Sequence, residues 1–163
     1  QGIPFLIQCL RRCVGMEDAF FVVCGTGTEY PRLKAFVEAE RPGNVLLLNG
    51  LPSEEYEALA SACDVGLLFL DYRFTIPNFP SRLLSYLQWK LPVIACTDPC
   101  TDVGEIAEEG GFGWRCSSGE AEEFVRTVAR ACQADRRAMG EAGRAYLSAH
   151  YTAEWSYHII TGK

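Results

Sequence analysis

Histidine is scarce in this 163-residue sequence, which has only two, and none of its eight cysteines forms a C-x-x-C pair. Two pairs, Cys9/Cys13 and Cys96/Cys100, are each four residues apart. Zinc sites usually combine cysteine and histidine ligands at characteristic close spacings, which these pairs do not match. We therefore expect no metal and no cofactor, and the sequence argues against a redox or metal protein built on its cysteines.

Long apolar runs are also absent. The strongest run, "VGLLFL" at Val65–Leu70, has six residues, against the roughly 20 that a membrane-spanning helix needs. The N-terminus shows neither a charged leader nor a cleavage site, so no signal peptide is expected, and the missing initiator Met indicates a fragment. We expect a cytoplasmic protein with reduced thiols, because Cys24, Cys63 and Cys96 lie in or beside apolar segments.

A concentrated positive charge is the third absence. The net charge is −6, and the densest basic clusters are the pairs Arg11-Arg12 and Arg136-Arg137. Nucleic acids and anionic membranes attract basic patches and repel an acidic surface. The sequence therefore predicts no nucleic-acid partner and no direct role at a membrane surface.

Apolar segments alternate with amphipathic segments along the whole chain, and 48% of the residues are hydrophobic. Strands are predicted at Ala19–Gly25, Asn44–Gly50, Val65–Leu70, Leu91–Thr97 and Phe112–Cys116. Helices are predicted from Ile3 to Leu10, through Leu33, Phe36 and Val37, from an N-cap at Ser53 to about Ala62, from Pro80, within 101–111, and from Glu120 onward. Because the strands are apolar throughout and alternate with helices, we expect one α/β domain over residues 1–163, a Rossmann-like doubly wound parallel sheet.

The chain begins with a helix, whereas a doubly wound domain begins with a strand. In the common order 3-2-1-4-5-6 the first strand lies in the middle of the sheet. We therefore expect the first strand to lie upstream of Gln1. The strands at Ala19–Cys24 and Val65–Leu70 would then either pair directly or flank a strand supplied from upstream.

Two loops that leave strands have unusual backbone chemistry. The first contains Gly25, Thr26 and Gly27, whose glycines allow a ligand to approach the backbone closely. The second contains Gly50, Leu51 and Pro52, which expose backbone N–H and C=O groups beside an apolar side chain, as the edge of a nucleobase requires. A plain strand-to-helix turn and a plain helix entry remain open as alternatives for the two loops.

The third loop is "IPNFPSRLLSY", Ile76 to Tyr86, which includes Asn78 and Phe79 and then becomes helical. Pro80 suits the first helical position, and the free N–H groups of Ser81, Arg82 and Leu83 would then point out of the helix start. The helix dipole and the charge of Arg82 favour an anion there, and a phosphate is the natural ligand. The alternative is a well-capped core helix beside a surface arginine.

The segment "IPNFPSRLLSYLQWKLPVIACTDPCTDVGEI" resembles the donor-binding region of bacterial glycosyltransferases of the GT-B fold, close to glycosyltransferase family 4. The similarity extends over nearly the whole chain and is most specific at "PSRLLSY" and "LPVIA". Such enzymes consist of two Rossmann-like halves with the active site between them. This chain resembles the later half, which holds the nucleotide sugar.

The resemblance implies a role for each loop. The turn Gly25-Thr26-Gly27 would face the nucleotide, Gly50-Leu51-Pro52 would receive the base, and the segment from Asn78 to Arg82 would grip the diphosphate, with Arg82 as the catalytic residue that stabilises the leaving group. Ser85 is a further donor contact.

Two expected features of the family are absent from these residues. Many family 4 members have two glutamates eight positions apart, and the corresponding positions here are Pro77 and Ser85. The basic pair that neutralises the diphosphate usually follows the first strand, and Gln1 would be the remnant of its second position. The donor and sugar contacts therefore cannot be copied from the two-glutamate pattern.

We expect transfer of a hexosyl or aminosugar group from a nucleotide sugar, with a UDP-sugar as the favoured donor, to a polysaccharide or lipid-linked acceptor of the bacterial cell envelope. Retention of the anomeric configuration is implied by the family 4 resemblance alone. The expected partner is the N-terminal, acceptor-binding half of the same enzyme, which could also bring the protein to the inner face of the membrane. Without that half the chain should be inactive, and the alternative is a nucleotide-binding module without transferase activity.

Overall fold

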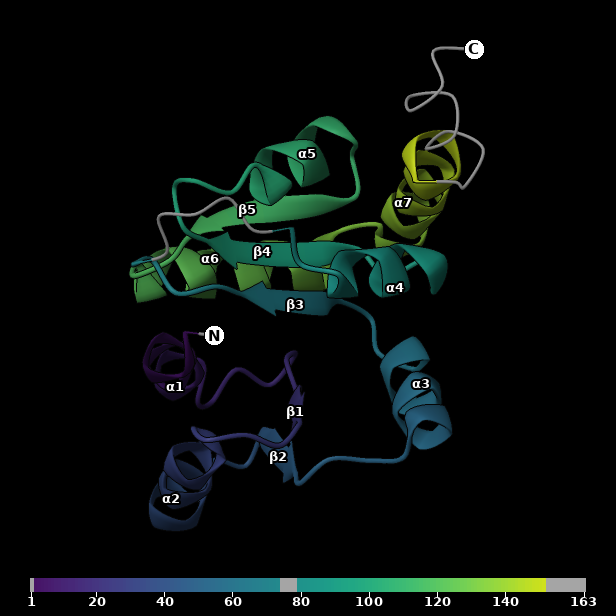
Figure 1. The fold of residues 1–163 in the computed structure, drawn as a ribbon. Helices are drawn as coiled ribbons and strands as arrows, with labels where there is room; N and C mark the ends of the chain where they lie inside the picture. The colour runs from purple at the N-terminus through teal and green to yellow at the C-terminus, as the bar shows by residue number, and fades with distance from the viewer. Residues whose placement is uncertain (1, 74–78, 152–163) are drawn as a thin grey trace.

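The computed structural model describes residues 2–73 and 79–151. The elements alternate in the order expected from the sequence (Figure 1): α1 Ile3–Arg12, β1 Phe21–Cys24, α2 Tyr30–Glu40, β2 Val45–Leu48, α3 Ser53–Ser61, β3 Gly66–Phe69, α4 Arg82–Gln88, β4 Val93–Thr97, α5 Val103–Glu109, β5 Gly113–Ser117, α6 Ala121–Gln133 and α7 Arg136–His150. Every predicted strand and helix is present. The predicted helical tail is two helices, because Ala134 is extended and Asp135 caps α7 by accepting a hydrogen bond from the Ala138 N–H.

The five strands form two parallel sheets instead of the single sheet that was predicted. β1 pairs with β2, and β4 lies between β3 and β5. In the described part of the chain β1 and β3 share no ladder, so direct pairing, one of the two predicted alternatives, is not found (Figure 1). Within the described residues, each of these two strands is therefore paired along one edge only. The fold class is otherwise confirmed as α/β with parallel strands.

The strand β4 organises the core because its side chains alternate between two apolar clusters. Ile94 and Cys96 belong to a cluster shared with α1, α2, β1, β2, β5 and α6. Val93 and Ala95 belong to a second cluster shared with α4, α5 and Phe112. All five β4 residues are buried, as expected for a parallel strand covered on both faces.

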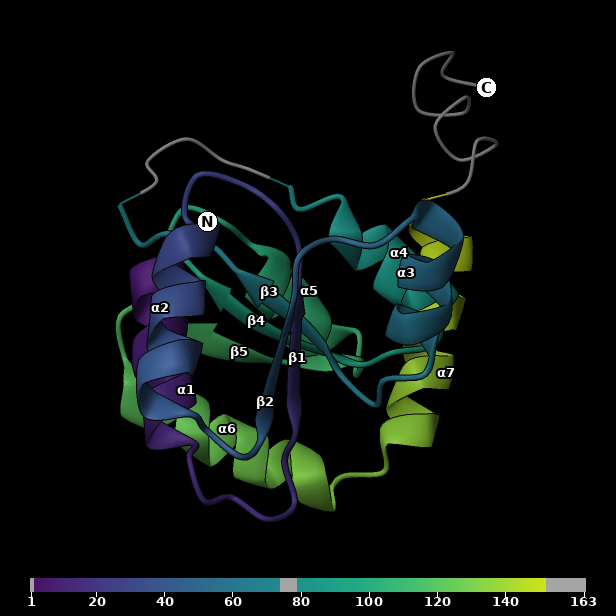
Figure 2. The same cartoon turned by 90° about the horizontal axis from the view of Figure 1, so that it is seen from below.

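Five of the helices named here, α1, α2, α3, α4 and α7, lie at the two ends of the fold (Figure 2). Figure 2 shows α1 and α2 together at one end, with α3, α4 and α7 at the other. α1 packs on α2 and α6, and α4 packs on α7. The end that contains α4 is the one that presents the predicted phosphate site.

All eight cysteines are free thiols. Cys9, Cys13, Cys96 and Cys116 are buried, and burial raises the pKa of Cys13 to about 11. Cys100 is exposed in the loop after β4 while Cys96 is buried inside the strand, so their four-residue spacing does not bring two ligands together. Within residues 2–73 and 79–151, no group of three or more His, Cys, Asp or Glu side chains could hold a metal ion.

A search of the same residues for membrane spans was also negative. No helix among them combines the length and the apolar character needed to cross a bilayer.

Candidate donor-binding site

The loops after β1 and β2 lie against each other at the carboxyl ends of these strands. The Gly25 N–H donates to the Leu48 carbonyl at 3.2 Å, which joins the two strand ends. Gly50 has a φ of +70°, and a Cβ at this position would lie 3.0 Å from the Thr26 side-chain methyl. Only glycine fits there without strain. The structure thus brings the first two predicted loops together.

The second loop leads directly into α3. Pro52 occupies the N-cap position, with φ −53° and ψ 151°, and its carbonyl accepts the N–H of Tyr56 at 2.9 Å. The prediction that Ser53 is the N-cap is wrong, because Ser53 is the first helical residue and its hydroxyl bonds Glu57 at 3.4 Å. Leu51 is half-buried, and Pro52 is exposed.

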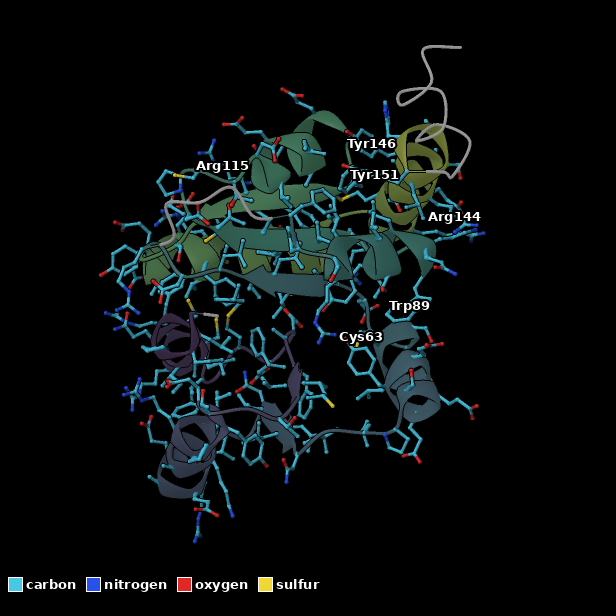
Figure 3. The ribbon with its side chains drawn as sticks, in the orientation of Figure 1. Cys63, Trp89, Arg115, Arg144, Tyr146 and Tyr151 are labelled. Atoms are coloured by element: carbon cyan, nitrogen blue, oxygen red, sulfur yellow. The ribbon has the colours of Figure 1, made fainter. Side chains whose placement is uncertain are left out.

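The third loop is described from Phe79 onward, and Asn78 lies outside the described residues. Phe79 is 41% exposed and its ring lies 5.4 Å from the ring of Tyr151. Figure 3 shows Tyr151 at the end of α7, beside Tyr146. Phe79 therefore connects the start of the α4 segment with the end of α7.

The start of α4 differs from the prediction. Arg82 is the first helical residue and Ser81 the N-cap, so Pro80 precedes the helix instead of occupying its first position. The Leu83 N–H is not free, because it donates to the Pro80 carbonyl at 2.9 Å. Pro80 thus begins a tight turn that leads into the helix. Of the three predicted N–H donors at the helix start, those of Ser81 and Arg82 are left as candidates for binding an anion.

Arg82 is exposed and makes a specific contact with α3. Its Nη1 donates to the Tyr56 hydroxyl, and its guanidinium carbon lies 5.1 Å from the centre of the Tyr56 ring. Arg82 therefore connects the third loop with the helix that begins at the second loop.

An aromatic group supports this contact. The Tyr56 ring meets the Trp89 ring edge to face at 6.4 Å, and the Tyr86 ring lies 6.5 Å from Trp89. Figure 3 shows Trp89 between α4 and α3, with Cys63 just beyond the end of α3. Burial raises the pKa of Tyr86 far above its ordinary value, and the neighbouring Tyr56 raises it further.

Ser85 lies one turn after Ser81 on α4, as predicted, and is half-buried. Its carbonyl accepts the Trp89 N–H at 3.0 Å. Of the leucines of α4, Leu83 and Leu87 are fully buried and Leu84 is half-buried. Ser85 therefore lies on α4 between Arg82, which begins the helix, and Trp89, which ends it.

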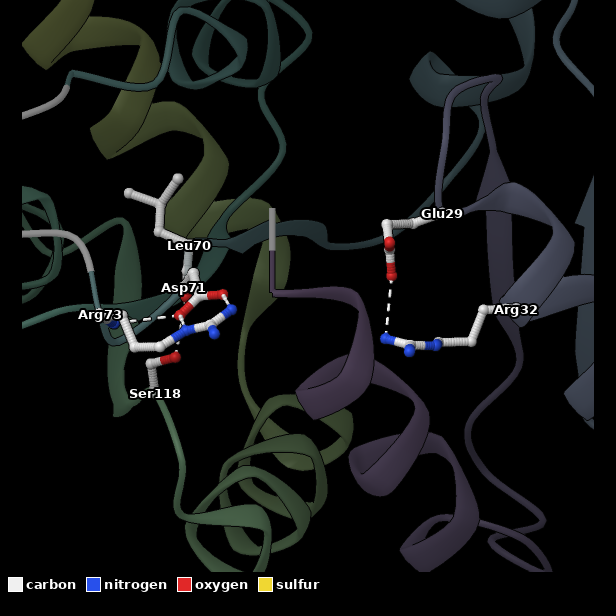
Figure 4. Close-up of polar contacts among 6 residues, drawn as sticks. All are labelled: Glu29, Arg32, Leu70, Asp71, Arg73 and Ser118. Atoms are coloured by element: carbon white, nitrogen blue, oxygen red, sulfur yellow. Dashed lines mark hydrogen bonds and ion pairs between the residues drawn. The ribbon is translucent and has the colours of Figure 1, made fainter.

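The sequence analysis did not identify Tyr56, Asp71 or Arg73. Arg73 donates two side-chain hydrogen bonds to Asp71, at 2.8 and 2.6 Å, just beyond the carboxyl end of β3 (Figure 4). This contact lowers the pKa of Asp71 well below its usual range. The sequence feature that could have predicted this pair is the run "LDYR" after the strand. It places an acidic and a basic residue two positions apart at the carboxyl end of a parallel strand, where ligands usually bind.

A second ion pair follows β1. Arg32 donates to Glu29 at 3.1 Å at the start of α2, just after the Gly25–Gly27 turn (Figure 4). The arginine neutralises an acidic group close to the turn predicted to face a nucleotide. The carboxyl ends of β1 and β3 thus each have an acid paired with an arginine.

The described residues also form two surface depressions. One, of about 490 Å³, is lined by residues of α5, β5 and α6, and the other, of about 500 Å³, by residues of α1 and α2. The candidate site is instead an open edge built from three loops, with the exposed Arg82, backbone groups and aromatic rings. Such an edge can bind a flat ring and an anion together.

Comparison with known proteins gives consistent relatives. The family described as "Glycosyl transferases group 1" matches residues 1–146. "Probable glycosyltransferase WbjE" of Pseudomonas aeruginosa is 24% identical over 152 residues, which cover 93% of this chain and 38% of that protein.

Two solved structures share the fold. WaaG, a glycosyltransferase involved in lipopolysaccharide biosynthesis, superposes with a TM-score of 0.64 at 19% identity over 99% of this chain and 44% of WaaG. The glycotransferase of kitacinnamycin gives 0.61 at 17% identity over 98% of this chain and 39% of that protein. The chain thus spans less than half the length of these relatives. Its α/β fold is of the GT-B type, and the chain belongs to the glycosyl transferases group 1 family.

Proposed function

We propose that this chain is the donor-nucleotide-binding half of a family 4 glycosyltransferase that transfers a sugar from a UDP-sugar to a polysaccharide or lipid-linked acceptor. The observation that carries the proposal is the proximity of the three loops. The Gly25 N–H bonds the Leu48 carbonyl, a Cβ at Gly50 would lie 3.0 Å from the Thr26 methyl, and Arg82 bonds Tyr56 of the helix that follows Pro52. Membership of the glycosyl transferases group 1 family supports sugar transfer. The role of WaaG in lipopolysaccharide biosynthesis supports a cell-envelope product.

Each loop has a task in the proposed reaction. The backbone at Gly50–Pro52 receives the base, the turn Gly25–Gly27 faces the nucleotide, and Pro80–Arg82 holds the diphosphate beside Ser85. As the bond between sugar and diphosphate breaks, negative charge grows on the leaving group. Arg82 and the N–H groups of Ser81 and Arg82 stabilise this charge in the transition state. The proposal therefore requires no metal or cofactor.

The acceptor-binding half is proposed to be the partner. The chain spans 38% of WbjE and 44% of WaaG, and a site between two halves needs residues from both. We expect the purified chain to transfer no sugar by itself, as measured by the release of UDP from UDP-sugars in the presence of acceptor. Transfer by this chain alone would contradict the half-enzyme proposal. The predicted cytoplasmic location, with contact to the inner membrane face through the other half, stays a prediction.

UDP should bind the chain, and Arg82→Ala should weaken binding by about 1.5–3 kcal/mol, the scale of a hydrogen bond to a charged group. The loss arises because the diphosphate is left with backbone donors alone. Calorimetric titration with UDP measures the change, and higher salt should weaken the binding of the unsubstituted chain.

Arg130→Ala is the matched control, because Arg130 is an exposed arginine on α6, away from the three loops. It removes the same charge and should leave the affinity unchanged. Equal losses in both variants would show that only the net charge matters, and an unchanged Arg82→Ala variant would remove Arg82 from the site.

UDP binding without transfer by the full-length protein would favour the nucleotide-binding module, and tight zinc uptake without nucleotide binding would favour the metal protein.

A further inference from the structure

Tyr56 contacts the side chain of Arg82, the residue on which the proposed site depends most. Its hydroxyl accepts a hydrogen bond from Arg82 Nη1, and its ring lies 5.1 Å from the Arg82 guanidinium carbon. A hydrogen bond and a cation–π contact from one residue fix both the position and the plane of a guanidinium. An exposed arginine at a helix start would otherwise sample many rotamers.

Tyr56 is itself anchored on two sides. Its backbone N–H donates to the carbonyl of Pro52, in the loop proposed to receive the base. Its ring packs against Trp89, which packs against the half-buried Tyr86 of α4. These contacts therefore connect the loop that contains Pro52 with the start of α4, which carries Arg82.

We propose that Tyr56 is a positioning residue that orients Arg82 toward the diphosphate and couples the base-binding loop to the phosphate-binding loop. The inference rests on the proposed function. Arg82 has five N–H donors, and the contact with Tyr56 engages one of its terminal nitrogens, so donors remain for phosphate oxygens. Because the guanidinium is ordered before the ligand arrives, binding loses less side-chain entropy.

The test is a double-substitution cycle measured by calorimetry with UDP. Tyr56→Phe keeps the ring and its packing on Trp89 but removes the hydroxyl that accepts from Arg82. We expect about a tenfold loss of UDP affinity, the scale of one hydrogen bond to a charged group. In an Arg82→Ala background the same substitution should cause no further loss, because Tyr56 acts through Arg82.

Tyr146→Phe is the control, since this tyrosine lies on α7 and packs on Phe112. It removes a hydroxyl of the same kind and should leave UDP affinity unchanged. Thermal unfolding of each variant checks that the fold is retained.

A second measurement needs no nucleotide. The heteronuclear NOE of the Arg82 side-chain Nε–H should show an ordered group in the unsubstituted chain and a mobile one in Tyr56→Phe.

Each outcome decides a separate point. Unchanged UDP affinity in Tyr56→Phe overturns the positioning role, and an equal loss in both backgrounds overturns it in favour of direct contact between Tyr56 and the nucleotide. If the unsubstituted chain binds no UDP, the proposed function fails and the diphosphate role of Tyr56 fails with it. The NOE then shows separately whether Tyr56 orders Arg82, and an unchanged NOE would overturn that part too.

Discussion

Replacing Phe112 by alanine is expected to lower the free energy of unfolding by about 3–5 kcal/mol, the usual cost of removing a buried aromatic ring. The Phe112 side chain is fully buried, and its ring lies 5.1 Å from the ring of Tyr146 on α7. It belongs to the same apolar cluster as Leu83 and Leu87, the buried face of α4. The cavity would therefore loosen the helix that presents Arg82, and urea denaturation measures the loss.

Phe20→Ala is the matched control, because Phe20 precedes β1 and is 63% exposed. Removing an exposed ring of the same size should change the free energy of unfolding by about 0.5 kcal/mol or less. A loss of less than about 1 kcal/mol in Phe112→Ala, with an unchanged dependence on urea, would show that the second cluster does not support the fold as described.

The order of elements could be predicted because it depends on local patterns. The runs that became β3 and β4 are apolar except for Thr97 at the end of β4, so they do not alternate between apolar and polar residues as a strand with one solvent-facing side would. The helix predicted within 101–111 ends at its two glycines: Gly110 is the C-cap of α5 and Gly111 has a φ of +67°. Such signals lie within a few residues of the feature that they specify.

Contacts between distant segments could not be predicted in the same way. Tyr56 and Arg82 are 26 residues apart, and no local pattern around Tyr56 distinguishes it from other half-buried helical residues. The exact helix starts were also missed by one or two positions, at Ser53 and at Pro80. In both cases a proline carbonyl accepts a backbone N–H of the first turns, so the proline marks the approach to the helix instead of its first residue.

The separation of the two sheets has consequences for local stability. β4 is hydrogen-bonded on both edges, whereas β1 is paired only with β2 within the described residues. A two-stranded ribbon alone is marginally stable in water, so the β1–β2 pair depends on its packing against α1 and α2. The expected strand from upstream, which would lie between β1 and β3, stays a prediction.

The amides of the β1–β2 ladder should exchange with solvent at least about 100-fold faster than those of β4, a difference of about 2.7 kcal/mol in opening free energy. The slowly exchanging amides should include those of Gly66 and Val93. The Gly66 N–H bonds the Pro92 carbonyl and the Val93 N–H bonds the Phe112 carbonyl, and these bonds join β3, β4 and β5 into one unit. Hydrogen exchange followed by NMR measures both groups in one experiment. If the amides of the β1–β2 ladder and of β4 were equally protected, the two sheets would open together as one unit. The shared apolar core alone would then couple them, and no strand between them would be needed. If the expected difference is found and then disappears in a chain extended upstream of Gln1, the added residues supply the strand that joins the sheets.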